Sequence, residues 1–159
     1  MPGGFPKLAT LSDIEVVEAT PLAERLDAAD VFGVLKAAAG RHGDKICLID
    51  IADPSDPATD RVWSYREAFA QITRTANALH KLGQGKPVGY LLPNLAETHF
   101  VLWGAAAGAG AAPVNPLLSA DVIVEILAAA GAGCLVTTAP GTELYETAMA
   151  ACDALGGLP

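Results

Sequence analysis

The stretch from Thr137 to Thr142 (TTAPGT) has the composition closest to a chemical site. It follows a predicted strand, opens a predicted helix, and combines three threonines with a glycine. Hydroxyls, glycine and a helix N-terminus are features with which proteins hold phosphate and other anions. The stretch contains no lysine, however, and Pro140 has no backbone N–H to donate. A turn ending in a helix cap explains the same residues, so both interpretations stay open and the cap is favoured.

A second candidate is the trio Gly104, Gly108 and Gly110. A dinucleotide-binding fingerprint needs its glycines after a strand and at the opening of a helix. Here the glycines close a predicted helix and precede a strand, so this interpretation is rejected. We expect instead that glycine and alanine let this helix lie close to the sheet.

Histidines, cysteines and carboxylates offer no recognisable catalytic or metal-binding pattern. The histidines are His42, His80 and His99, and none stands at a metal-ligand interval from a cysteine or carboxylate. The cysteines are Cys47, Cys134 and Cys152; without a CxxC pair, they are expected to be buried free thiols of a reducing, cytoplasmic compartment. No serine lies in a nucleophile elbow. The sequence thus predicts no catalytic, cofactor-binding or metal-binding residue.

The predicted strands do indicate where a pocket would lie. In open α/β sheets, ligands bind beyond the carboxyl ends of the strands. Those ends are the turns Pro93-Asn94, Asn115-Pro116 and Thr137-Thr138. These turns are therefore the places to look for a site, although plain caps and turns remain the favoured interpretation.

Composition bounds the class of protein. The chain has 159 residues, 52% hydrophobic and 18% charged, which is typical of a globular domain and not of a disordered one. Its net charge is −8 and its basic residues form no run, so nucleic-acid binding is not expected. The first twenty residues do not read as a signal peptide. The uncharged run from Phe100 to Ala120 contains Pro113 and Pro116, so a core helix and a short strand are expected there, with no transmembrane segment.

Periodicity predicts alternating helices and strands. Helices are expected at residues 13–19, 31–41, 65–82, 95–107, 120–130 and after Thr142, and strands at 45–51, 61–63, 87–92, 111–114 and 134–137. Capping patterns are read at Ser12/Glu15, Ser64/Glu67 and Asn94/Glu97. Strands separated by helices predict an α/β fold with a mostly parallel sheet and helices on both faces. Residues 1–29 are interpreted as a lead segment with a short helix, and 30–159 as the α/β subdomain.

Several segments resemble the adenylate-forming (AMP-binding) enzymes, most of all fatty-acyl-CoA synthetases. They are Trp63-Ser64-Tyr65-Arg66-Glu67, Thr75–Leu79 with Leu82-Gly83, Leu91–Asn94, and the stretch Ala109–Pro116 (AGAAPVNP). Residues 12–26 also resemble the leading segment of one acyl-CoA synthetase branch. The chain departs from the family at Gly85-Lys86-Pro87, where relatives usually have Gly-Asp.

The resemblance implies that this chain is about the first quarter of such a synthetase, with residues 30–159 forming the first part of its large N-terminal domain. The intact enzyme would activate a carboxylic acid with ATP and Mg²⁺ and transfer the acyl group to CoA. The family's phosphate loop, magnesium-binding acid and catalytic lysine lie further along, and no position here matches them. The implied role is a scaffold, inactive alone, whose partner is the remainder of the synthetase chain. The alternative is a stand-alone, non-catalytic α/β binding or interaction module derived from a synthetase.

Overall fold

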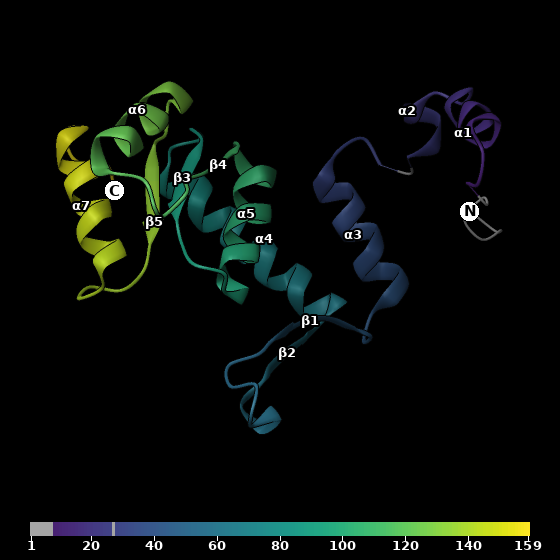
Figure 1. The fold of residues 1–159 in the computed structure, drawn as a ribbon, viewed down its shortest axis with the longest axis horizontal. Coiled ribbons are helices and arrows are strands. Elements are labelled where there is room, and N and C mark those ends of the chain that lie inside the picture. The colour runs from purple at the N-terminus through teal and green to yellow at the C-terminus, as the bar shows by residue number, and fades with distance from the viewer. Residues whose placement is uncertain (1–7, 27) are drawn as a thin grey trace.

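The computed structural model describes residues 8–26 and 28–159. The helices are α1 (Leu11–Glu18), α2 (Leu22–Arg25), α3 (Val31–His42), a 3-10 turn at Pro57–Thr59, α4 (Tyr65–Leu82), α5 (Ala96–Gly108), α6 (Ala120–Ala130) and α7 (Glu143–Ala154). The strands are β1 (Ile46–Asp50), β2 (Arg61–Ser64), β3 (Val88–Leu91), β4 (Ala111–Pro113) and β5 (Cys134–Thr137). Their order in the chain matches the predicted alternation of helices and strands (Figure 1).

The centre of the molecule is a three-stranded parallel sheet in the order β4-β3-β5. Val88 of β3 stands in register with Ala111 of β4 and with Cys134 of β5. Helices α4 and α5 lie on one face of this sheet, and α6 and α7 lie on the other (Figure 1). The predicted α/β class, with a mostly parallel sheet and helices on both faces, is therefore confirmed.

Strand β3 is buried on both faces because it is the middle strand. Its side chains alternate between the faces, as the two-residue period of a strand requires. Val88 and Tyr90 join the cluster under α4 and α5, which also holds Leu79, Val101, Ala105 and Cys134. Leu91 joins the cluster under α6 and α7, with Val114, Ile123, Leu127, Ala148 and Ala151. The core is thus two apolar layers separated by the sheet.

Two glycines permit close approach between neighbouring elements. A Cβ on Gly89 of β3 would lie 2.2 Å from Cδ2 of Leu127, so only glycine lets α6 settle at this height on the sheet. A Cβ on Gly104 of α5 would lie 2.9 Å from the backbone nitrogen of Ala76. The expectation that small residues bring α5 close to the sheet holds for Ala105, but Gly104 faces α4 instead.

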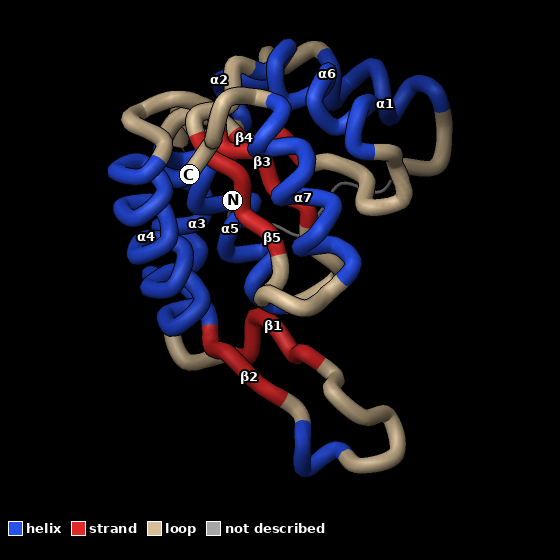
Figure 2. The backbone as a smooth tube through the Cα atoms, turned by 90° about the vertical axis from the view of Figure 1, so that its left-hand side faces the viewer, coloured by secondary structure: helices blue, strands red, loops and turns tan. Residues whose placement is uncertain are grey.

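Strands β1 and β2 form a separate antiparallel hairpin and do not extend the parallel sheet. It projects from the body beyond the start of α4, as Figure 2 shows. Its inner face contributes Leu48 and Trp63 to a third apolar cluster with Phe100 of α5. Its outer face carries Cys47, which is exposed, so the expectation of three buried thiols is wrong for this residue. Cys134 and Cys152 are buried as expected.

The helix caps follow the sequence in part. Ser64 and Glu67 form a capping box on α4 and Thr142 caps α7, both as predicted, and Asp30 caps α3. Two predicted caps are wrong. The capping box of α1 uses Thr10 and Asp13, not Ser12 and Glu15, so α1 begins earlier. The N-cap residue of α5 is Leu95, with no side-chain hydrogen bond, so Asn94 does not cap it.

The lead segment contains two helices where one was predicted, because α2 forms within the expected connector. Neither α1 nor α2 has a buried residue. Figure 1 shows both at the far end of α3, away from the sheet. We call residues 8–26 the N-terminal arm.

Candidate functional site

The three predicted turns meet at one edge of the molecule, because the three strands that precede them are parallel neighbours. At the β3 turn, the hydroxyl of Thr98 donates to the carbonyl of Pro93 at 2.6 Å. At the β4 turn, the backbone N–H of Leu117 donates to Oδ1 of Asn115 at 3.0 Å. At the β5 turn, the hydroxyl of Thr137 lies 3.1 Å from the carbonyl of Leu91. Each of these polar side chains stabilises its own turn or joins two strands.

The TTAPGT stretch is organised as a helix cap. Oγ1 of Thr142 accepts from the N–H of Tyr145 at 3.1 Å and lies 3.2 Å from the carbonyl of Ala139. The hydroxyl of Thr138 is hydrogen-bonded to that of Thr142. The first turn of α7 also carries Glu143 and Glu146, whose charges repel an anion. The residues therefore do not fit a phosphate group, and the cap interpretation is the one that the structure favours.

A small cavity of about 240 Å³ opens beside the β3 turn, between the hairpin and the start of α5. Residues 48–51 of β1 and its exit form one wall, and residues 94–96 with His99 form the other. The polar side chains on its walls are Asp50, Asn94 and His99. Hairpin and sheet edge thus enclose one shallow polar site.

Arg61 of β2 holds that wall in place. Its guanidinium group contacts both carboxylate oxygens of Glu97 on α5, at 2.6 and 3.0 Å. It also donates from Nε to Oδ2 of Asp50 on β1 at 3.1 Å, and from Nη2 to the same oxygen. Hydrogen bonding by Arg61 lowers the pKa of Glu97, and the two carboxylates raise the pKa of Arg61. We call Arg61, Asp50 and Glu97 the hairpin clamp.

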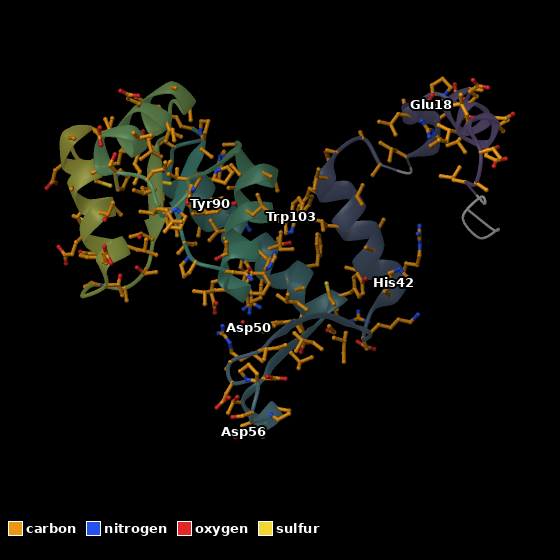
Figure 3. The ribbon with its side chains drawn as sticks, in the orientation of Figure 1. Glu18, His42, Asp50, Asp56, Tyr90 and Trp103 are labelled. Atoms are coloured by element: carbon orange, nitrogen blue, oxygen red, sulfur yellow. The ribbon has the colours of Figure 1, made fainter. Side chains whose placement is uncertain are left out.

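Aromatic side chains pack against the hairpin clamp. The guanidinium carbon of Arg61 lies 5.3 Å from the ring centroid of Trp63, and the Trp63 ring meets Phe100 edge-on at 5.6 Å. Figure 3 shows Asp50 where the hairpin approaches α5, with Trp103 higher on the same helix. Sequence reasoning assigned Glu97 to a cap and did not predict the hairpin clamp. A pair 36 residues apart leaves no local pattern to detect.

The other two histidines lie away from this edge of the sheet. His42 packs on the ring of Tyr65 at 4.9 Å between centroids, and Nδ1 of His80 lies 3.4 Å from the carbonyl of Gly108. Neither lines the cavity at the sheet edge. Among residues 8–26 and 28–159, no group of histidines, cysteines and carboxylates could hold a metal ion. None of the helices in this described part is long and apolar enough to cross a membrane.

Comparison with known proteins places this fold in a family. A sequence model of the family described as "AMP-binding enzyme" matches residues 35–156. The marinolic acid–CoA ligase of Pseudoalteromonas sp. (strain SANK 73390) is 35% identical over 155 residues, which cover 94% of this chain and 23% of the relative. A long-chain-fatty-acid–CoA ligase of Mycobacterium tuberculosis (strain ATCC 25618 / H37Rv) is 33% identical over 104 residues, 64% of this chain and 21% of the relative. The chain thus spans about a quarter or less of these relatives.

Two solved structures of similar fold agree with this family match. The Mycobacterium tuberculosis fatty acyl CoA synthetase superposes with a TM-score of 0.62 at 26% identity, covering 74% of this chain and 23% of that one. A long-chain-fatty-acid CoA ligase structure from Rhodopseudomonas palustris CGA009 superposes with a TM-score of 0.68 at 23% identity, covering 83% of this chain and 32% of that one. This match shows likeness of fold alone. With the family match, the parallel sheet and the turns LLPN and AGAAPVNP in their expected places, this chain belongs to the AMP-binding enzyme family.

Proposed function

We propose that this chain is the N-terminal scaffold of an ATP-dependent acid–CoA ligase. The observation that carries the proposal is the match of most of the α/β body to the AMP-binding family. The relatives' names describe ligases that join a carboxylic acid to CoA. In the proposed reaction, the intact enzyme forms an acyl-adenylate from ATP and a carboxylic acid and then passes the acyl group to CoA.

The proposed contribution of this chain is mechanical. The sheet β4-β3-β5 supplies a rigid edge, and the hairpin clamp holds a wall of the 240 Å³ cavity against that edge. Sites on rigid elements keep their geometry better than sites on free loops. The residue that contacts substrate is therefore expected in the part of the relatives that this chain does not span.

The cofactors of such a ligase are ATP, Mg²⁺ and CoA. The β5 turn does not fit phosphates because its hydroxyls are already bonded and acidic residues follow it. We therefore derive no step of the reaction through this chain and propose that it is inactive alone. We also propose a cytoplasmic location, which the free thiols Cys47, Cys134 and Cys152 support.

A chimera tests the scaffold role. Residues 35–156 would replace the equivalent segment of the Mycobacterium tuberculosis long-chain-fatty-acid–CoA ligase, and ATP–pyrophosphate exchange would be measured with a long-chain acid. The proposal predicts exchange by the chimera. A matched chimera carrying Gly89→Trp, which cannot fit under Leu127, should fold poorly and lose the exchange.

A folded chimera with native circular dichroism and no exchange would contradict the scaffold role. It would favour instead a stand-alone α/β module whose surface has diverged from that of a synthetase. A chimera that aggregates would be replaced by one exchanging only the sheet and its helices, residues 65–154, judged by the same two readouts.

A further inference from the structure

The N-terminal arm presents apolar side chains to solvent. Leu11 is 71% exposed and Leu22 is 62% exposed, and Leu8, Ile14, Val16 and Leu26 are exposed as well. Both helices lack a buried residue. Exposed apolar patches of this kind mark interaction surfaces in soluble proteins.

The same arm is acidic. Its charged residues are the four acids Asp13, Glu15, Glu18 and Glu24 and one base, Arg25. Glu18 stands out on the arm in Figure 3, remote from the rest of the molecule. A surface that binds the arm therefore has to accommodate apolar side chains flanked by carboxylates.

The body offers a surface with the opposite charge. A groove of about 250 Å³ lies between α3, α4 and α5, lined by Phe32, Thr73, Ala76, Asn77, His80, Ala107 and Gly108. We call it the α3–α5 groove. Its lining includes the small residues Ala76, Ala107 and Gly108, which leave room for aliphatic side chains beside the Phe32 ring.

The helices around the α3–α5 groove carry mainly basic residues, although the acidic Asp30 caps the start of α3 close to Phe32. The chain has 18 acidic residues, yet none lies in α3, in α4 beyond Glu67 or in α5 beyond Glu97. The exposed charged residues there include Lys36 on α3 and Arg74 and Lys81 on α4. A protein of net charge −8 thus concentrates positive charge beside the groove.

We propose that the N-terminal arm of one copy docks in the α3–α5 groove of a second copy of this chain, and that the exchange is reciprocal. The arm's apolar side chains enter the groove while its carboxylates meet Lys36, Arg74 and Lys81. Figure 1 shows α3 between the arm and helices α4 and α5 of the same chain, so that the arm extends away from the body. Exchange of a terminal element between identical chains gives a closed twofold dimer at low cost.

The occupant is a second copy because the two complementary surfaces lie on one chain. The arm belongs to the part before residue 35, which the family model does not match. The match to the Pseudoalteromonas ligase covers 94% of the chain and therefore includes part of the arm. The docking proposal is independent of the acid–CoA ligase chemistry.

Charge exchange tests the docking. An arm variant, E15K/E18K, gives a basic arm beside a basic groove, and a groove variant, R74E/K81E, gives an acidic arm beside an acidic groove. Sedimentation velocity of the 159-residue chain should show a dimer for the wild type. Each variant alone should dissociate, with its dimer Kd raised on the order of tenfold or more by like charges. An equimolar mixture of the two variants should recover the dimer, because both contacts are then complementary.

The matched control is E143K/E146K on α7, which changes charge equally on the opposite side of the sheet and should dimerise like the wild type. Far-ultraviolet circular dichroism establishes that every variant is folded. A wild type that stays monomeric up to hundreds of micromolar overturns the proposal. So does a dimer that neither variant weakens, or a mixture that remains monomeric while each variant is folded.

Discussion

The packing of α6 over β3 can be tested by adding a single methyl group at Gly89. Gly89 lies in the middle strand, and a Cβ there would come 2.2 Å from Cδ2 of Leu127. Carbon atoms pack best at about 3.5–4 Å. The methyl would therefore overlap Leu127 by more than an ångström. Leu127 is only 1% exposed and has little room to rotate away.

We expect Gly89→Ala to lower the free energy of unfolding by about 1–3 kcal/mol, the usual range for overpacking. Leu127→Ala should lower it by about 2–5 kcal/mol, because it leaves a cavity in the layer under α6 and α7. In the double variant the new methyl partly fills that cavity. The combined loss should therefore fall short of the sum by roughly 1 kcal/mol or more.

Urea unfolding followed by circular dichroism measures all three variants. Gly40→Ala is the matched control, since a Cβ there meets nothing within 4 Å and alanine favours a helix. That control should gain about 0.5–1 kcal/mol. Wild-type stability in Gly89→Ala, or strict additivity with Leu127→Ala, would show that α6 does not cover β3 at this point.

Three further predictions concern single sites. Because Arg61 lowers the pKa of Glu97 below the unfolded value of 4.5, the hairpin clamp should stabilise the protein above that pH and lose its effect as the pH falls through the folded-state pKa. The stability difference between the wild type and Arg61→Met in urea should accordingly shrink from pH 7 to below about pH 4, and a constant difference would refute the clamp. In the native protein the thiol of Cys47 should react with a disulfide reagent, and after denaturation all three cysteine thiols should react. Fast reaction of all three thiols in the native protein would contradict the burial of Cys134 and Cys152. Thr142→Ala should lower the free energy of unfolding by about 1 kcal/mol through loss of the α7 cap. Millimolar phosphate should leave the Tm of the wild type and of the variant unchanged. A phosphate-dependent rise in Tm in the wild type alone would restore the anion-site interpretation.

The alternation of helices and strands could be predicted because the signals are local. The bounds predicted for strand β5 are the observed ones, and α4 from Tyr65 to Leu82 follows from its helical periodicity and the Ser64 cap. The turn before β3 lacks the acid that the family usually has there. It is formed by Gln84 and Gly85, both with positive φ, at 52° and 75°. Two left-handed residues let the chain reverse in a short turn.

The pairing of β1 could not be read from its sequence. The run KICLIDI is apolar enough to suggest a strand buried on both faces, yet Ile49 and Ile51 remain exposed on the hairpin. Apolar runs that do not alternate are typical of buried parallel strands, and here that rule misleads. The hairpin also exposes Cys47, which the apolar neighbours had suggested to be buried.

The remaining misses depend on contacts between distant parts of the chain. Glu97 fits a capping pattern with Asn94 in sequence, but Arg61 draws it into the hairpin clamp at 2.6 Å. Gly104 seemed suited to the sheet and instead faces Ala76 of α4. Competition between a local cap and a long-range ion pair is settled by tertiary geometry, which spacing alone does not contain.

Isotopic exchange between ATP and pyrophosphate by the purified 159-residue chain tests the central claim most directly. With Mg²⁺ and a panel of aliphatic and aromatic carboxylic acids, the account predicts no exchange above the buffer blank, because the role that we propose for the chain is a scaffold without phosphate-binding or catalytic groups. Acid-dependent exchange that copurifies with the chain and disappears in the misfolded Gly89→Trp variant would contradict it.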